Sequence, residues 1–85
     1  MTFQIAARMK SGEKWEGWRF RHLEVGTYFH IYESGSMMPY VKTSERYACA
    51  EWNFDNFTRA NRTYLRIHFD ERVEPCLVRE KAVID

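Results

Sequence analysis

Three segments of the chain alternate between apolar and polar residues, and this alternation most limits what the chain can fold into. Residues 3–9, 27–33 and 63–70 each show the period of two that is typical of half-buried strands. Residues 27–33 are also rich in aromatic and β-branched side chains, which favour strands. The pattern therefore predicts a fold built around a sheet.

Weaker patterns indicate the remaining strands. Residues 15–25 are expected to form a strand whose phase changes near His22, which predicts a bulge or bend there. Residues 40–42 are expected to form a short extended piece. Pro75 lacks the N–H that a central strand needs, so we expect residues 76–79 at a sheet edge. Residues 80–85 would then continue that strand or form a frayed end.

One helix is expected between residues 44 and 61. The Ser44 hydroxyl can cap free amide groups at the start of a helix. Four apolar residues fall on one stripe of the helical wheel, as in a helix that faces a core: Tyr47, Ala50, Phe54 and Phe57. Trp52 falls outside this stripe.

Together these elements predict an α+β fold in the order β-β-β-α-β-β. The expected architecture is a mainly antiparallel sheet of about five strands with one helix packed on one face. A length of 85 residues corresponds to a single domain, residues 1–85, and excludes large catalytic scaffolds such as the (β/α)8 barrel. The content of 45% hydrophobic and 29% charged residues is that of a folded chain.

The sequence also bears on location and cofactors. No segment approaches the ~20 consecutive apolar residues that cross a bilayer, and the first residues lack the layout of a signal peptide. We therefore expect a soluble, cytoplasmic protein with no membrane partner. Cys49 and Cys76 are expected to be reduced and buried. The cysteines and histidines have no zinc-ligand spacing, so we expect neither a metal nor a cofactor.

The kind of basic residue is more informative than the net charge. Thirteen basic residues against twelve acidic ones give a net charge of +1, which indicates no particular partner. Nine of the thirteen are arginines. A GC-rich genome would give the same bias, but arginine also binds phosphate and carboxylate in a bidentate manner and stacks on aromatic rings.

The strand phases place a basic and aromatic face opposite the helix. It is expected to carry the polar members of each alternating strand, and exposed Trp52 of the helix is added to them as a further contact residue. The candidate partner-binding residues are therefore Arg8, Arg19, Arg21, Tyr28, His30, Tyr32, Tyr64, Arg66, His68 and Trp52. Most of the acidic residues fall in turns or on the expected helix.

The favoured hypothesis is a small non-enzymatic interaction protein that acts by occupying the surface of a macromolecular partner. Tyrosine, tryptophan and arginine dominate the binding hot spots of protein interfaces. Inhibitors and accessory factors encoded by phages and mobile elements are of similar size. The expected partner is a protein, for instance a nucleic-acid enzyme. We expect replacement of Arg19, Arg21, Arg66 and Tyr28 by alanine to weaken binding without unfolding the domain.

Four alternatives remain open. The same face could bind single-stranded RNA, because arginines neutralise phosphates while tyrosines and histidines stack on bases. It could belong to a small endoribonuclease in which His30 and His68 exchange protons beside Tyr64 and Arg66. It could also be buried in a homodimer, or have no role beyond ordinary cross-strand pairing.

Overall fold

The computed structural model describes residues 17–31 and 38–84. Along the chain the elements are β1 (Trp18–Arg19), the 3-10 helix η1 (Phe20–His22), β2 (Tyr28–Ile31), β3 (Tyr40–Lys42), β4 (Tyr47–Ala50), α2 (Glu51–Asn56), the 3-10 helix η2 (Arg59–Asn61), β5 (Leu65–Arg66) and β6 (Arg72–Pro75). The expected strand over residues 3–9 and the candidates Arg8 and Tyr32 lie outside the described residues.

The strands form one antiparallel sheet in the order β1-β6-β2-β3-β4-β5. β2, β3 and β4 are neighbours both in the chain and in the sheet, with Tyr28 opposite Val41 and Val41 opposite Cys49. β6 lies between β1 and β2 and places Val73 opposite Trp18. The predicted α+β fold with a mainly antiparallel sheet and one helix is confirmed. The described residues form six strands rather than about five, and the helix follows the fourth of them rather than the third.

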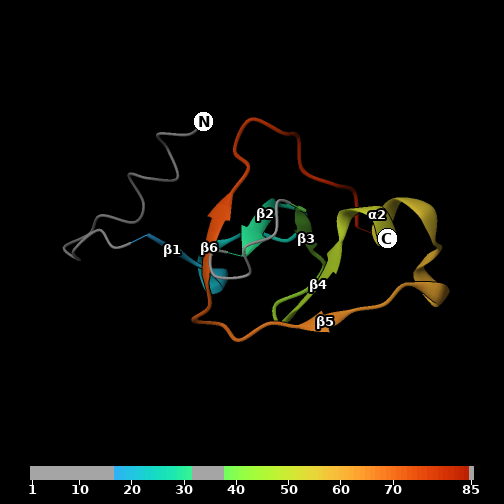
Figure 1. The fold of residues 1–85 in the computed structure, drawn as a ribbon, viewed down its shortest axis with the longest axis horizontal. Coiled ribbons are helices and arrows are strands. Elements are labelled where there is room, and N and C mark those ends of the chain that lie inside the picture. Colours follow the sequence, from blue (N-terminus) through green and yellow to red (C-terminus); the bar gives the residue numbers. More distant parts are fainter. Residues whose placement is uncertain (1–16, 32–37, 85) are drawn as a thin grey trace.

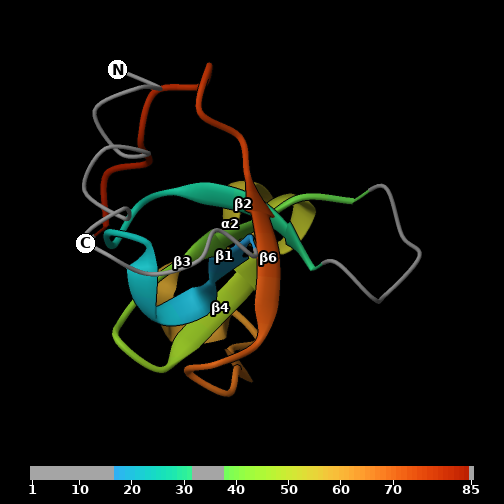
Figure 2. The same ribbon diagram turned by 90° about the vertical axis from the view of Figure 1, so that its left-hand side faces the viewer.

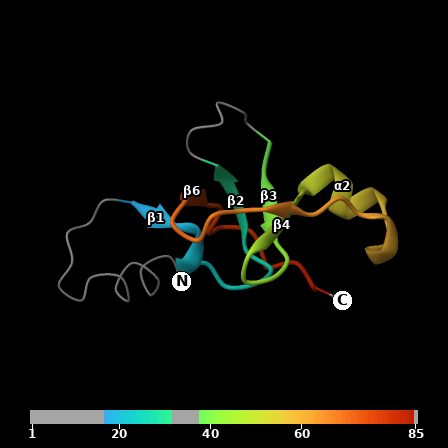
Figure 3. The same cartoon turned by 90° about the horizontal axis from the view of Figure 1, so that it is seen from below.

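The sheet is strongly curved, because its two edges contribute to one buried cluster. Trp18 of β1 and Ile67, which follows β5, both belong to the cluster that contains Phe20 and Phe29. The Phe20 N–H also donates to the Glu71 carbonyl at 2.9 Å, which ties the β1 edge to the segment after β5. This segment runs along the lower margin of the molecule from α2 towards β6 (Figure 1) and crosses in front of β4 in Figure 3. Figure 2 shows β6 and β4 crossing at a steep angle.

The opposite face of the sheet is covered as well. A second buried cluster consists of Tyr28, Val41, Cys49 and Phe54. Phe54 comes from α2, which packs against β3 and β4, while Ala82 and Ile84 of the C-terminal segment pack against the same cluster. Successive strand residues point to opposite faces, so Tyr28 enters this cluster and Phe29 enters the first. The expectation of an open sheet face opposite the helix is therefore wrong.

The C-terminal segment, residues 76–84, crosses the second cluster without forming a helix or strand. It passes from β6 towards α2, as Figure 1 shows, and Arg79 forms an ion pair with Glu51 of α2 at 2.7 Å. The Ala82 N–H donates to the Gly26 carbonyl at 2.8 Å. Gly26 has a φ of +97°, and a Cβ at this position would lie 2.7 Å from the Ala82 carbonyl oxygen. Glycine is therefore required at position 26 for this approach.

Lys42 is buried with only 3% of its surface exposed. Its Nζ donates to the carbonyls of Phe20 at 3.0 Å and Leu23 at 2.8 Å, and lies 4.4 Å from the centre of the Phe20 ring. Burial lowers the pKa of Lys42, and the Glu45 carboxylate partly opposes this effect. The ammonium group thus joins β3 to the turn that follows β1.

The expected helix start at Ser44 is wrong, because residues 47–50 form strand β4. This strand pairs with β3 on one side and with β5 on the other, so the sheet satisfies its backbone hydrogen bonds. Ala48 and Cys49 are both fully buried, on opposite faces. The helix covers only Glu51–Asn56, since Asn53, Asp55 and Asn56 are weak helix formers. No helix among residues 17–31 and 38–84 has the length and apolarity that a membrane crossing requires.

The strand predictions were accurate for β2 and β3 and less accurate for the other described strands. β2 and β3 lie within the predicted segments 27–33 and 40–42. The predicted bend near His22 is present as η1, but the strand before it has only two residues. In the predicted strand 63–70 only Ile67 is buried, while Leu65 and Phe69 are exposed.

The prediction of an edge strand over residues 76–79 is wrong. The strand at this point in the chain is β6, which ends at Pro75 and lies between β1 and β2, inside the sheet. The proline is accommodated there because it is the last residue of the strand. The next N–H, that of Cys76, donates to the Tyr28 carbonyl at 2.8 Å.

Candidate interaction surface

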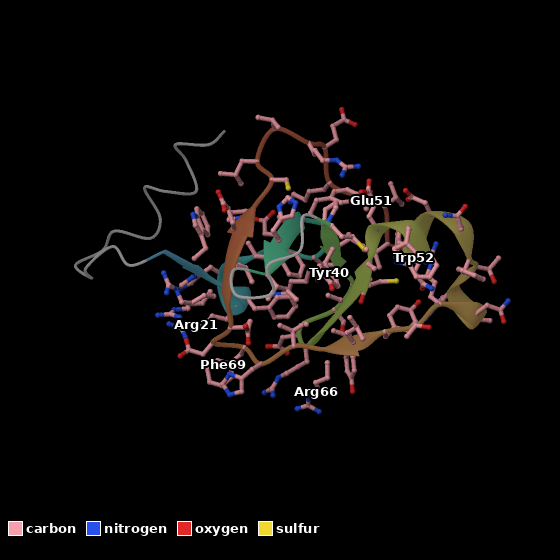
Figure 4. The ribbon with its side chains drawn as sticks, in the orientation of Figure 1. Arg21, Tyr40, Glu51, Trp52, Arg66 and Phe69 are labelled. Atoms are coloured by element: carbon pink, nitrogen blue, oxygen red, sulfur yellow. The ribbon has the colours of Figure 1, made fainter. Side chains whose placement is uncertain are left out.

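Exposed aromatic and basic side chains gather around β5, at one edge of the sheet. They come from the residues where β4 begins and from the stretch that contains β5. This group, the β5 surface, consists of Arg46, Tyr47, Tyr64, Arg66, His68 and Phe69, all of which are exposed. Figure 4 shows Arg66 and Phe69 along the lower margin of the molecule.

Two guanidinium groups of the β5 surface lie beside aromatic rings. Arg66 is directly opposite Tyr47 in the β4–β5 pair, and its Cζ lies 5.9 Å from the centre of the Tyr47 ring. The Arg46 Cζ lies 6.0 Å from the centre of the Phe69 ring, which stacks on His68 at 4.6 Å. These separations are at the outer limit of a cation–π contact, so neither ring fully engages its arginine.

The arginines of this surface keep their positive charge available. The described ion pairs join Arg21 to Asp70, Arg79 to Glu51, and Lys81 to Glu24. Within the described ranges, no carboxylate forms an ion pair with Arg46, Arg59 or Arg66. The surface near β5 therefore presents cationic groups that no described carboxylate pairs with.

A pocket of about 690 Å³ adjoins the β5 surface and shares Tyr47 and Tyr64 with it. Its wall is mainly apolar and includes Phe54 and Ile84, with Arg59 and Arg62 at its side. The Arg62 guanidinium lies 3.9 Å above the Phe54 ring, and its Nε donates to the Phe54 carbonyl. The Tyr64 hydroxyl donates to the Arg59 carbonyl at 3.3 Å, which holds the ring at the pocket wall.

Asn53 of α2 fixes the position of the chain that leads into β5. Its side chain is buried, and its Oδ1 accepts a hydrogen bond from the Thr63 N–H at 2.8 Å and one from the Cys49 thiol at 3.2 Å. Tyr64 and β5 follow directly after Thr63. The helix thereby positions one end of the β5 surface relative to β4.

The prediction that Tyr28 belongs to an exposed binding face is wrong. Only 9% of its surface is exposed, and the Arg79 guanidinium covers its ring at 3.8 Å. Burial raises the pKa of the Tyr28 hydroxyl, with a further contribution from the Asp55 carboxylate, while Arg79 opposes both. Replacement of Tyr28 by alanine would remove core packing, so it does not test binding alone.

Arg19 and Arg21 lie in β1 and η1, next to the turn that follows the β5 surface. Arg21 forms an ion pair with Asp70, and the Arg19 guanidinium donates to the Asp70 carbonyl at 3.4 Å. Arg19 and Arg21 therefore lie near His68 and Phe69, but both guanidinium groups already form contacts with Asp70. They differ in this respect from Arg46 and Arg66.

His30 and His68 lie in different parts of the sheet. His30 is on β2, which β3 and β4 separate from β5 in the strand order, and its Nδ1 lies 3.6 Å from the Cys76 sulfur. His68 follows β5, and its Nδ1 accepts a hydrogen bond from the Asp70 N–H at 3.1 Å. The predicted set for RNA cleavage is thus divided: Tyr64, Arg66 and His68 lie together, and His30 does not join them.

Trp52 is exposed on α2, away from Arg66 and Phe69, as Figure 4 shows. Its ring meets that of Phe57 edge to face, with the centroids 6.1 Å apart. This aromatic pair is a separate feature of the molecule's surface. Trp52 is therefore not part of the β5 surface.

Sequence reasoning missed Arg46, Tyr47 and Phe69. Tyr47 had been assigned to the buried stripe of a helix, and Phe69 to the apolar side of a strand. Arg59 and Arg62, which stand beside the pocket, were not among the candidates either. One signal could have indicated that Tyr47 begins a strand. The small residues Ala48 and Cys49 that follow it are suited to a tightly packed strand between two neighbouring strands.

The two cysteines are both free thiols in unlike surroundings. Cys49 is fully buried, whereas Cys76 is half-buried beside His30. Burial raises the pKa of each thiol, and a nearby arginine opposes the shift in both cases. The expectation of burial is therefore confirmed for Cys49 and holds only partly for Cys76. Among the described residues, no group of three or more metal-ligating side chains occurs.

We expect a thiol reagent to label native protein at Cys76 and to reach Cys49 only after unfolding, because access limits the attack of a thiolate. Absorbance during reaction with an aromatic disulfide would give one equivalent per chain, and a second in denaturant. Cys76→Ser should abolish the native equivalent, while Cys49→Ser should keep it. Equal labelling rates at the two positions would contradict the assigned burial.

Comparisons with known proteins add no relative to this picture: no family model matches the chain, and no curated protein or solved structure is similar enough to count as a match.

Proposed function

We propose that the chain is a non-enzymatic interaction protein that binds an anionic region of a macromolecular partner through the β5 surface. The observation that carries this proposal is the pair of exposed guanidiniums, Arg46 and Arg66, which lie beside exposed rings and form no ion pair with any described carboxylate. Arginine and aromatic side chains contribute much of the binding energy of interfaces.

Two further features support the proposal. His30 lies on β2 and His68 follows β5, with β3 and β4 between these strands in the sheet, and this separation favours binding over acid–base catalysis. Cys49 and Cys76 are unpaired thiols, which suits a reducing compartment, and we place the protein in the cytoplasm on that basis. An acidic patch on a protein or the phosphates of a nucleic acid would each match the charge of the surface.

Removal of both free guanidiniums should abolish capture of the partner. In the variant Arg46→Ala/Arg66→Ala we expect the partner recovered on the immobilised protein from lysate to fall at least about tenfold, because each charge-assisted hydrogen bond contributes about 1.5–3 kcal/mol. Quantitative mass spectrometry and nucleic-acid staining of the salt eluate measure the change.

Arg21→Ala is the matched control, because Arg21 is also exposed but is already paired with Asp70. Its capture should stay within about twofold of wild type. Undiminished capture by the double variant would rule out the β5 surface as the binding site. So would an equal loss in the control.

A further inference from the structure

We infer that the partner of the β5 surface is single-stranded RNA, and that the adjoining pocket receives one unstacked base. This inference rests on the proposed function, because it names the partner of the same surface. It names the class of ligand, and it assigns the aromatic rings to stacking on bases and the guanidinium groups to binding phosphates.

The first argument is the pairing of rings with cations along β5. Tyr47 is paired with Arg66, and Phe69 with Arg46, so each exposed ring has a positive charge about 6 Å from its centre. Each unpaired nucleotide offers one flat base and one phosphate. An exposed ring beside an exposed guanidinium therefore matches one such nucleotide, with the base on the ring and the phosphate on the guanidinium.

The second argument is the pocket that Tyr47 and Tyr64 help to line. Its volume of about 690 Å³ leaves room for a base, and the pocket is open towards solvent. Tyr64 provides a flat wall, the Arg62 guanidinium lies over the Phe54 ring, and Arg59 adds a charge that no described carboxylate neutralises. A ligand with a flat ring and an anionic group would fit a pocket that has an aromatic wall and a nearby arginine, and a nucleotide has both features.

Other polyanions match the surface less well. A duplex keeps its bases stacked and paired, so it would satisfy the guanidiniums but leave the exposed rings without a partner. An acidic peptide would satisfy the charges but would need apolar side chains at matching intervals. RNA is favoured over DNA because its loops and ends present unstacked bases to proteins.

The test is fluorescence anisotropy of a labelled single-stranded RNA of about 12 nucleotides, a length within the site sizes of single-strand binders. We expect binding at about 50 mM salt that weakens steeply towards about 200 mM. With Arg46, Arg59 and Arg66 each meeting one phosphate, the log–log slope should be about −2. The same RNA as a duplex, and polyglutamate, are measured as competitors.

Substitutions of Tyr64 separate stacking from charge. Tyr64→Leu should weaken RNA binding by about 5- to 100-fold, whereas Tyr64→Phe, which keeps the ring, should bind within about threefold of wild type. Trp52→Ala removes an exposed ring outside the surface and should leave the affinity unchanged. Circular dichroism of each variant checks that the fold is retained.

The outcomes separate the inference from the proposal beneath it. Salt-sensitive binding that depends on the Tyr64 ring supports RNA as the partner. The inference is overturned if RNA fails to bind at low salt, if the duplex or polyglutamate competes equally well, or if Tyr64→Leu binds like wild type. If RNA fails while capture from lysate still depends on Arg46 and Arg66, the proposed function stands and the partner is an acidic protein.

Discussion

Replacement of Phe29 by alanine should lower the free energy of unfolding by about 3–5 kcal/mol. Phe29 lies in β2, near the middle of the sheet, and none of its surface is exposed. Its ring meets Phe20 edge to face at 5.5 Å and stacks on Tyr40 at 5.9 Å. The truncation would leave a cavity between these rings. Urea unfolding followed by tryptophan fluorescence measures the change.

A loss of this size is a large part of the total stability, since a domain of 85 residues has about 4–13 kcal/mol available. Phe69→Ala makes the same truncation at a side chain that is 44% exposed, and should cost less than about 1 kcal/mol. The Phe69 variant should still fold while its binding weakens. If both variants were equally stable, Phe29 would not be the core residue described here.

Replacement of Lys42 by alanine should cost about 2–4 kcal/mol of unfolding free energy. The change removes two charge-assisted hydrogen bonds, to the carbonyls of Phe20 and Leu23, and also the packing of the lysine stem. Lys42→Met keeps an apolar stem of similar length, so it should cost less than the alanine variant. Urea unfolding at neutral pH compares the three proteins.

The same lysine should make stability depend on pH in a defined direction. Burial lowers the pKa of Lys42 below its ordinary value of 10.5, so between the two values the folded protein binds fewer protons at this site than the unfolded chain. Stability of the wild type should therefore rise with pH through that interval, relative to Lys42→Met. The raised pKa values of Tyr28, Cys49 and Cys76 act oppositely, but they are common to both proteins and cancel in the difference. A difference that is flat or falls with pH would contradict a buried, charged Lys42.

The parts of the fold that sequence reasoning predicted are those that depend on local pattern. β2 follows from the pattern of residues 27–33, because apolar and polar residues alternate there and most of them are aromatic or β-branched, which favours strands. β4 was missed because Tyr47 and Ala50 fall on a helical stripe with Phe54, although both belong to a paired strand. Pairing on both sides by β3 and β5, which are distant in sequence from each other, decided between the two.

The part of the candidate site that was predicted also depends on a local pattern in the sequence. Tyr64, Arg66 and His68 were placed on an exposed face by their alternation, and they are exposed. The face expected around Tyr28 is covered, because residues 76–84 fold back across β2 and β3. That return depends on two backbone hydrogen bonds, from Cys76 to Tyr28 and from Ala82 to Gly26, and on a few side-chain pairs far apart in the chain, which no local period records. The ring–cation pair of Arg46 with Phe69 likewise joins residues that sequence spacing does not connect.

Position 26 has a consequence for how related chains can diverge. Any other residue there would meet the Ala82 carbonyl and would also need a left-handed backbone. A chain that keeps the C-terminal segment in place must therefore inherit this glycine, even if its exposed arginines and tyrosines have drifted. A homologue with a bulky residue at this alignment column should have a different C-terminal path and a differently shaped pocket, because Ile84 of that path forms part of the wall.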